Sequence, residues 1–207
     1  MRVLVACEYS GRVRDAFLKL GHEAMSCDLL PTDRPNWTYD PFTRIRTHHP
    51  ERGSHYKGSV LDILDHEWDL MIAHPPCTYI SKAGVRWLHS DPTRWAKLSK
   101  ACDFFNQLLD ADIPRICIEN PIPHRYAIER LHFRKYTQII HPWQHGHGET
   151  KATCLWLKGL PPITPTDIVD GREQRMLNLS PSKDRQKKRS LTYEGIANAF
   201  ATQWGTP

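Results

Sequence analysis

Three short apolar runs, each followed by polar residues or prolines, constrain the fold of this chain more than any other feature. They are "RVLVA" at 2–6, "DLMIAH" at 69–74 and "RICIEN" at 115–120. Near-continuous apolar runs of this length are typical of strands that are buried on both faces of a parallel sheet. The clearest helix is predicted over "DPTRWAKLSKACDFFNQLLDAD", where Asp91 can cap the first turn and Pro92 suits it.

Strands that alternate with helices predict an α/β fold with a mostly parallel, doubly wound, Rossmann-like sheet. A further strand is expected at 23–30, helices over "GRVRDAFLKLGH" and "SVLDILDHEW", and a closing helix over "TYEGIANAFATQW". Residues 31–54, rich in Pro, Arg, His and Thr, are expected to form one long loop. The length of 207 residues suits a single domain over 1–207 with one full core.

The composition points to a cellular context. The net charge is +5 and the pI is near 8.9, which suits a polyanionic partner such as nucleic acid without requiring one. The six cysteines are scattered with no C-x-x-C spacing, which is typical of a reducing, cytoplasmic compartment. No apolar stretch approaches the ~20 residues needed to cross a bilayer and no signal peptide precedes the first strand, so no membrane association is expected.

Polar residues follow each predicted strand, and ligand sites on doubly wound sheets lie at the carboxyl ends of the strands. Those ends carry Cys7, Glu8, Tyr9, Ser10 and Gly11, then Asp28, then Pro75, Pro76 and Cys77, then Glu119, Asn120 and Pro121. Adjacent parallel strands would bring the Cys77 thiol beside the Glu119 carboxyl group. That pair suits nucleophilic attack on an electron-poor ring with simultaneous protonation of the ring. Taken alone, either residue is more simply a packing or turn residue.

Two of these segments resemble a known family. "HPPCTYIS" is similar to the Pro-Cys nucleophile motif of the DNA cytosine 5-methyltransferases, and "IENPI" resembles their Glu-Asn motif, in the same order. Downstream, "GHGETKATCLW" resembles the family's Gln-x-Arg-x-Arg segment, with Glu149, Lys151 and Thr153 at the corresponding places. "GIANAFATQW" resembles its last motif, with Asn198 matching an asparagine. The resemblance covers 2–158 and 190–204 and is greatest to a compact, phage-type branch.

The resemblance implies methyl transfer from S-adenosylmethionine to carbon 5 of a cytosine that is extruded from DNA. Cys77 would attack ring carbon 6, and Glu119 would protonate or hydrogen-bond ring nitrogen 3. Cations such as Lys151 and Arg86 could help to form the Cys77 thiolate. The implied catalytic residues are Cys77, Glu119 and Lys151. The implied cofactor-binding residues are Cys7, Glu8, Tyr9, Ser10, Gly11, Asp28, Pro75 and Asn198. The implied substrate-binding residues are Pro76, Ser81, Asn120, Pro121, Thr153, Lys187 and Arg189.

The sequence departs from the family pattern in three places. The first loop keeps only Gly11 of the Phe-x-Gly-x-Gly segment, although Asp28 is in place to hold the ribose hydroxyls. Ser59 stands where the family tends to carry an aspartate, and Asp62 is open as its replacement. The target-recognition region is reduced to 159–189, before a closing helix at 190–204 that is expected to return to the cofactor side. Its basic residues suit phosphate contact or a solvated face, and they are Lys183, Arg185, Lys187, Lys188 and Arg189.

Several readings of the sequence stay open at this point. The same chemistry could act on a nucleotide, on single-stranded DNA or with a modified donor, or the fold could serve as a non-catalytic DNA-binding module. A homodimer or a separate recognition partner is also open. No metal site is predicted, because His141, His145 and His147 match no zinc spacing and are expected to lie solvated in a loop. Tryptophans that could stack on bases, Trp87 among them, are expected to pack instead.

Overall fold

The computed structural model describes residues 1–39, 44, 46–49, 52–132, 134–175, 178–180, 182 and 185–206. The strands in these ranges are β1 (Arg2–Ala6), β2 (Glu23–Asp28), β3 (Trp37–Tyr39), β4 (Arg46–His48), β5 (Ser54–Lys57), β6 (Leu70–Ala73), β7 (Arg115–Pro121), β8 (Gln138–Ile140) and β9 (Thr153–Lys158). The helices are α1 (Arg12–Lys19), α2 (Trp87–Ser90), α3 (Thr93–Leu109), α4 (Arg125–Arg130), α5 (Arg185–Ser190) and α6 (Glu194–Trp204).

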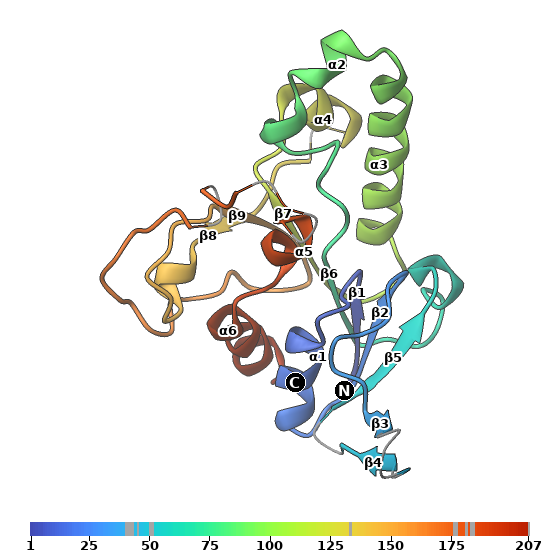
Figure 1. Cartoon of the computed structure of the whole chain (residues 1–207). Coiled ribbons are helices and arrows are strands. Elements are labelled where there is room, and N and C mark those ends of the chain that lie inside the picture. The colour runs from blue at the N-terminus through green and yellow to red at the C-terminus, as the bar shows by residue number, and fades with distance from the viewer. Residues whose placement is uncertain are drawn as a thin grey trace.

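Seven strands form the central sheet, in the order β5-β2-β1-β6-β7-β9-β8 (Figure 1). β5, β2, β1, β6 and β7 pair in parallel, and β9 is antiparallel to both β7 and β8. The winding proceeds outward from β1 through β2 in one direction and from β6 through β7 in the other. The predicted α/β fold with a mostly parallel, doubly wound sheet is therefore confirmed, and its switch point lies between β1 and β6.

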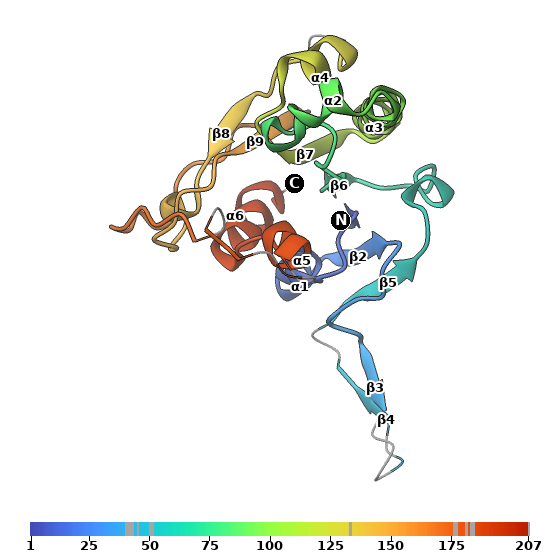
Figure 2. The same cartoon turned by 45° about the horizontal axis from the view of Figure 1, so that its top comes forward.

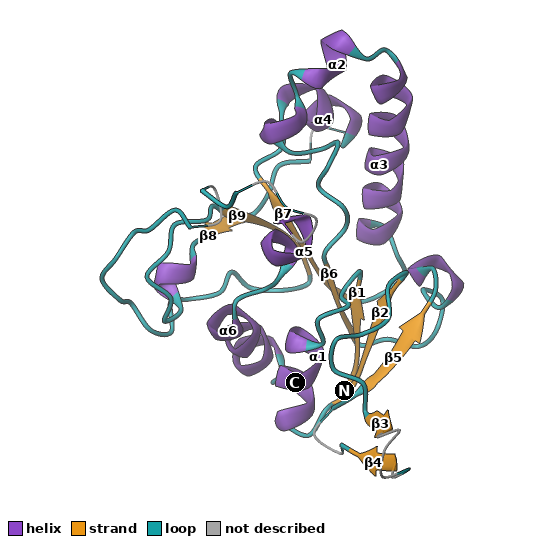
Figure 3. Ribbon diagram, viewed as in Figure 1, coloured by secondary structure: helices purple, strands orange, loops and turns teal. Residues whose placement is uncertain are grey.

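Helices cover both faces of the sheet (Figure 3). On one face α1 and α6 pack against Val3 and Val5 of β1, and on the other face α3 packs in the core that holds Leu4 and Ala6. All four of these β1 side chains are fully buried. The apolar runs are continuous rather than alternating because neither face of the central strands meets water.

Three predictions about local structure are wrong. The segment 31–54 is not one loop, since β3 and β4 pair as an antiparallel hairpin that projects from the body of the molecule (Figure 2). Within the segment 31–54, residues 40–43, 45, 50 and 51 lie outside the described part of the chain. The predicted helix over "SVLDILDHEW" is only the 3₁₀ turn Val60–Asp62, and the second strand ends at Asp28 rather than at residue 30.

An extended pair of segments was not expected from the sequence. Residues 143–150 and 166–173 run side by side, joined by backbone bonds such as Val169 N–H to the Trp143 carbonyl (3.0 Å) and Glu173 N–H to the Gly148 carbonyl (3.1 Å). This pairing includes residues 166–173 of the segment 159–189 that was expected to serve target recognition. Within the part of the chain that the structure describes, no helix is both long and apolar enough to cross a membrane.

Candidate active site

The proline-rich loop that carries Cys77 begins where β6 stops. Two consecutive prolines cannot donate to the sheet ladder, so the strand ends before them. The loop is then fixed from both sides. Asn120, at the end of the neighbouring β7, donates its side-chain N–H to the Pro75 carbonyl (2.8 Å). The Cys77 carbonyl accepts the backbone N–H groups of Ile80 (3.1 Å) and Ser81 (2.9 Å), which closes a turn beneath the thiol.

Glu119 lies beside this loop because β6 and β7 are adjacent and parallel, with Ala73 opposite Ile118. Its carboxylate accepts a hydrogen bond from Nδ1 of His74 (2.9 Å), and both side chains are nearly buried. A carboxylate can only accept, so the proton of this bond is on the imidazole. Burial alone would raise the pKa of Glu119, but the His74 hydrogen bond and the charges of Lys151 and His74 outweigh it and lower the pKa. Nε2 of His74 is buried and has no hydrogen-bond partner among the described residues.

Opposing charges act on the Cys77 thiol. Burial and the negative charge of Glu119 raise its pKa, while the charges of Lys151 and Arg189 act in the opposite sense. The net pKa is above that of an ordinary thiol. The three predicted catalytic residues Cys77, Glu119 and Lys151 thus lie within one electrostatic neighbourhood, and Arg189 belongs to it as well. Arg86 does not, since its guanidinium lies over the Trp87 ring at 4.7 Å.

The C-terminal part of the chain closes over the site through α5 (Figure 2). Nζ of Lys151 donates to the Arg189 carbonyl (3.1 Å), and the Tyr9 hydroxyl donates to the Lys187 carbonyl (2.8 Å). Lys187 itself binds Asp33 through its ammonium group (2.8 Å). Of the two residues of α5 that were predicted to bind substrate, Arg189 acts by its charge on the Cys77 thiol, whereas the ammonium group of Lys187 is held by Asp33. Lys183 lies outside the described residues.

A cavity of about 180 Å³ lies at the carboxyl ends of β1, β2 and β5, beside the proline loop. Its wall is formed by Cys7, Cys27, Asp28, Leu29, Gly58, Ser59, Val60, Pro76 and Phe104. Burial, with smaller effects from Asp28 and Cys27, raises the pKa of Cys7 to about 12. The Cys7 thiol that lines the cavity is therefore uncharged at neutral pH. Pro76 lines this cavity, whereas Pro75 is buried behind it with its carbonyl bound to Asn120. Pro75, which was predicted to bind the cofactor, is thus not part of the cavity lining, whereas Pro76, which was predicted to bind substrate, is.

A larger cavity of about 350 Å³ lies at the opposite edge of the sheet, at the amino ends of β1 and β2. It is lined by Arg2, Leu18, Glu23, Ala24, Met25, Gly53, Ser54 and Trp68. None of these residues belongs to the cluster around Cys77. We therefore take the smaller cavity as the candidate cofactor site, because it lies at the switch-point edge where ligands bind doubly wound sheets.

The loop after β1 serves mainly to begin α1. The Glu8 carboxylate accepts the backbone N–H groups of Val13 (2.8 Å) and Arg14 (3.3 Å) and the hydroxyl of Ser10 (2.9 Å). Gly11 adopts φ 70°, and a Cβ there would lie 2.5 Å from the buried Arg14 guanidinium. Glu8, Ser10 and Gly11 were predicted to bind the cofactor. The structure instead uses the two side chains and the glycine to cap the helix, with Glu8 4% exposed.

The remaining predicted residues lie in varied surroundings. Thr153 and Ser81 are buried, and the Thr153 hydroxyl donates to the Lys151 carbonyl (3.3 Å). Pro121 pairs with Thr153 across β7 and β9. Asn198 is exposed on α6, outside the lining of the candidate cofactor cavity. Asp62 accepts the Tyr56 hydroxyl (3.3 Å) and does not line that cavity either.

The histidine segment is not the solvated loop that was expected. His145 is 2% exposed and its Nδ1 bonds the Thr166 hydroxyl (3.0 Å), while Nε2 of His147 accepts the Gly195 N–H (3.0 Å). Glu149 is also buried, accepting the Tyr193 hydroxyl (2.6 Å) and pairing with Arg175 (3.0 Å). Among the described residues no group of three or more His, Cys, Asp or Glu side chains could hold a metal ion.

Three functional features are not predicted by the sequence. His74 is marked there only as a strand residue, although its partner Glu119 stands out. Asn120 acts on the loop of the neighbouring strand, which is visible only once β6 and β7 are paired. Nothing in the sequence places Arg189 beside Cys77, since 112 positions of sequence order separate them. A signal for His74 does exist, because it directly precedes the two prolines at a strand end.

Comparisons with known proteins give similarity of shape only. No family model matches the chain, and no curated protein matches it. One solved structure is described as a DNA modification methyltransferase encoded within a prophage (E. coli), with 14% identity and a TM-score of 0.49, covering 87% of this chain. A second is the Entamoeba histolytica methyltransferase EhMeth, with 13% identity and a TM-score of 0.45, covering 88%. This chain spans 55% and 60% of their lengths. At such values neither structure carries an argument about this protein.

Proposed function

We propose that this protein is a DNA cytosine 5-methyltransferase that uses S-adenosylmethionine. The observation that carries the proposal is the pair formed by Cys77 and Glu119 at the ends of two adjacent parallel strands. A thiol and a carboxyl group are thereby presented side by side, next to a cavity at the switch point. A thiol beside a carboxyl group suits addition to an electron-poor ring with simultaneous protonation of that ring.

The thiolate of Cys77 would add to ring carbon 6 of an extruded cytosine. Only the thiolate attacks, and the raised pKa of Cys77 keeps most of the group protonated in the absence of substrate. Lys151 and Arg189 stabilise the thiolate by charge. After methylation, a base such as water takes the proton from carbon 5, and the electrons of that C–H bond re-form the double bond between carbons 5 and 6. The carbon–sulfur bond breaks with its electron pair on sulfur, which leaves as the thiolate, and the proton on nitrogen 3 returns to the Glu119–His74 pair.

Glu119 would serve ring nitrogen 3, with His74 behind it. Because the pKa of Glu119 is lowered, its resting form is the carboxylate, which cannot donate to a ring nitrogen. The His74 imidazole lies 2.9 Å away. When His74 is an imidazolium, its Nδ1 proton can pass along the existing hydrogen bond to Glu119, which leaves a neutral imidazole. The pair then delivers that proton to nitrogen 3 as the thiolate adds to carbon 6, so that no negative charge accumulates on the ring.

The cavity beside Pro76 suits the nucleoside end of the donor. Its wall is apolar at Leu29, Val60 and Phe104, and the Asp28 carboxylate at the end of β2 suits a vicinal diol. The volume of about 180 Å³ is below the range of roughly 300–1,000 Å³ usual for ligand sites, so the rest of the donor would extend out of the cavity. When bound, S-adenosylmethionine supplies the electrophilic methyl group.

A covalent-trapping experiment tests the proposal. DNA that contains 5-fluorocytosine, incubated with the protein and S-adenosylmethionine, should form an adduct that survives denaturing electrophoresis, because fluorine cannot leave as a proton. The Cys77→Ser variant should form none, and omission of the cofactor should abolish the adduct. Wild-type protein that forms no adduct on single-stranded or duplex DNA would contradict the proposal.

One observation favours a second candidate function, a non-catalytic DNA-binding module, namely the raised pKa of Cys77. The same experiment decides between the two, since a module without catalysis traps nothing. Mass spectrometry of nucleosides from DNA of expressing cells tests whether the substrate is a free nucleotide and whether the donor is modified. Ordinary 5-methylcytosine in that DNA would exclude both. The single-domain organisation, and a homodimer or a recognition partner, remain predictions.

A further inference from the structure

A small lobe lies beyond the carboxyl ends of β6 and β7. It consists of residues 78–95, which follow Cys77 in the chain, and residues 122–130, which follow Glu119, and we call it the cap lobe. Two backbone bonds join the segments, from Lys82 N–H to the Ile122 carbonyl (3.2 Å) and from His124 N–H to the Ile80 carbonyl (3.0 Å). The lobe contains α2, the start of α3 and α4, and it forms the top of the molecule in Figure 1.

The cap lobe is strongly basic for its size. It holds five cations, Lys82, Arg86, Arg94, Arg125 and Arg130, against two acids, Asp91 and Glu129, which gives +3 of the +5 net charge of the chain. The Asp91 carboxylate accepts the backbone N–H (3.0 Å) and hydroxyl (2.6 Å) of Thr93, so it is directed at the start of α3. A lobe of this charge attracts a polyanion.

Each arginine of the lobe lies over an aromatic ring. The distances from guanidinium carbon to ring centroid are 4.7 Å for Arg86 over Trp87, 4.8 Å for Arg94 over Tyr79, 4.5 Å for Arg125 over Tyr126 and 5.1 Å for Arg130 over Trp95. Three of these rings, Tyr79, Trp95 and Tyr126, pack against the hydrophobic core. The arginines over these three rings are therefore explained by packing within the cap lobe.

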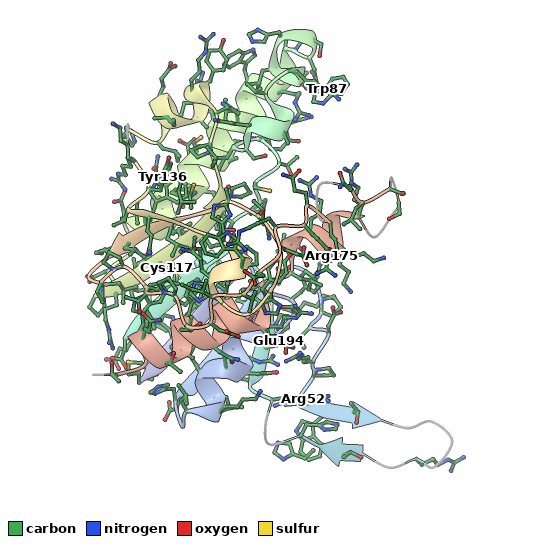
Figure 4. The ribbon with its side chains drawn as sticks, turned by 90° about the vertical axis from the view of Figure 1, so that its left-hand side faces the viewer. Arg52, Trp87, Cys117, Tyr136, Arg175 and Glu194 are labelled. Carbon is green, nitrogen blue, oxygen red and sulfur yellow. The ribbon has the colours of Figure 1, made fainter. Side chains whose placement is uncertain are left out.

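Trp87 is the exception. Its side chain is 49% exposed, and it lies at the outer end of the molecule, on the same side as Arg175 (Figure 4). Arg86, which covers it, is exposed as well. The expectation that Trp87 packs inside the protein is therefore wrong. An exposed tryptophan beside an exposed arginine, on a basic surface that adjoins a nucleophilic thiol, is the arrangement that stacks an unpaired base and neutralises its phosphate.

We propose that the cap lobe binds single-stranded DNA beside the cytosine that enters the site, with a base on Trp87 and phosphates on Arg86, Lys82 and Arg125. This names the substrate class of the proposed methyl transfer and rests on it. A base can stack on an aromatic side chain only when its face is not already covered by the neighbouring bases of a DNA duplex. Groove reading requires an element that inserts into the groove. Within the segment expected to serve target recognition, the described residues 166–173 are instead tied along 143–150.

Binding can be measured without turnover in a Cys77→Ser background. A labelled cytosine-containing oligonucleotide, offered single-stranded or as a duplex, is titrated by fluorescence anisotropy. We expect tighter binding of the single strand, and a loss of affinity of about tenfold in Trp87→Ala with partial recovery in Trp87→Phe. Arg86→Ala should also flatten the dependence of log affinity on log salt by about 0.7.

The matched controls are Lys19→Ala and Leu20→Ala at the end of α1. They form an adjacent cation and apolar residue, with Leu20 also 49% exposed, at the amino edge of the sheet. Equal affinity of Trp87→Ala and Leu20→Ala for the single strand, or preference for the duplex, overturns the proposal. If binding behaves as expected but no 5-fluorocytosine adduct forms, the proposed function fails while the surface stands. If the adduct forms and Trp87→Ala binds normally, the surface fails and the function stands.

Discussion

The Cys77 thiol depends on cations that come from distant parts of the chain. Replacing Lys151 by methionine removes one of them while keeping the length of the side chain, so the pKa of Cys77 should rise further. The thiolate fraction at pH 7.5 then falls, and alkylation by iodoacetamide should slow by about threefold to tenfold. The rates of variant and wild type should converge at high pH, where both thiols are ionised.

Lys158→Met is the matched control for that experiment. Lys158 ends β9, the strand that begins two residues after Lys151, and its ammonium group donates to the Ala111 carbonyl (2.7 Å). It should leave the pH profile of alkylation unchanged. Equal profiles for Lys151→Met and wild type would show that Lys151 does not act on the thiol.

His74 holds the Glu119 carboxylate in its ionised form. In His74→Leu the hydrogen bond is lost while burial remains, so the pKa of Glu119 should rise. In the wild-type protein the lowered pKa contributes stability above the unfolded value of about 4.3, and that contribution is lost as the pH falls through the folded value. The variant should therefore lose about 2 kcal/mol of unfolding free energy at pH 7 and less near pH 3.5.

Urea unfolding between pH 3.5 and 8 measures this dependence, with the exposed His89→Leu as control. A deficit that is the same at every pH would show that His74 contributes packing alone. Loss of methyl transfer in a variant that is folded at pH 7 would in turn support its role behind Glu119.

Among the elements, the start of α1 depends on one buried carboxylate. Glu8→Gln keeps one accepting oxygen but places an N–H₂ group near the backbone N–H groups of Val13 and Arg14. The helix also loses a negative charge at its N-terminus. We expect a loss of about 1–2 kcal/mol in unfolding free energy, measured by urea titration. Glu23→Gln, on the exposed start of β2, should cost little, and a similar cost in both variants would contradict the capping role.

β1, β6, β7 and α3 could be predicted because their apolar patterns are local. The three strands show continuous apolar runs because both of their faces are buried, and α3 is 17 residues long, so its apolar residues recur at helical spacing over several turns. β8 and the hairpin strands have three residues each and partly exposed faces, so no local pattern distinguishes them from loops. Their existence depends on pairing with distant segments.

The site divides in the same way. Cys77 and Glu119 could be paired from sequence because both end buried strands that were predicted to be adjacent. The hydrogen bonds that hold these two residues in place could not be predicted. The His74–Glu119 and Asn120–Pro75 bonds each join positions 45 residues apart, and they can be recognised only when the register of β6 against β7 is known. Glu8 was predicted to bind the cofactor because it follows the first strand. Its role in capping α1 could not be predicted, since that role depends on how the chain turns into the helix at Gly11.

At the scale of the whole molecule, the loop after β1 and the helix α5 meet over the site. The Tyr9 hydroxyl, from the loop after β1, donates to the Lys187 carbonyl and lies 3.3 Å from the Ser190 hydroxyl, both on α5. A six-residue helix has little stability of its own, so α5 depends on such contacts. Arg189, in its last turn, in turn supplies a charge that acts on Cys77.

Tyr9→Phe should therefore loosen α5 without disturbing the sheet. The ring is retained under the Lys187 ammonium group (5.0 Å), and only the hydroxyl bonds are lost. A loss of about 1 kcal/mol in the free energy of local opening corresponds to roughly fivefold faster amide hydrogen exchange over 185–190. The Cys77 thiol should also react faster with a bulky maleimide, because opening of α5 exposes it. Tyr136→Phe is the control, since its ring packs 5.8 Å from Trp156 at the other side of the sheet. Unchanged exchange in Tyr9→Phe, or equal acceleration in both variants, would show that the C-terminal part is held over the site by other contacts.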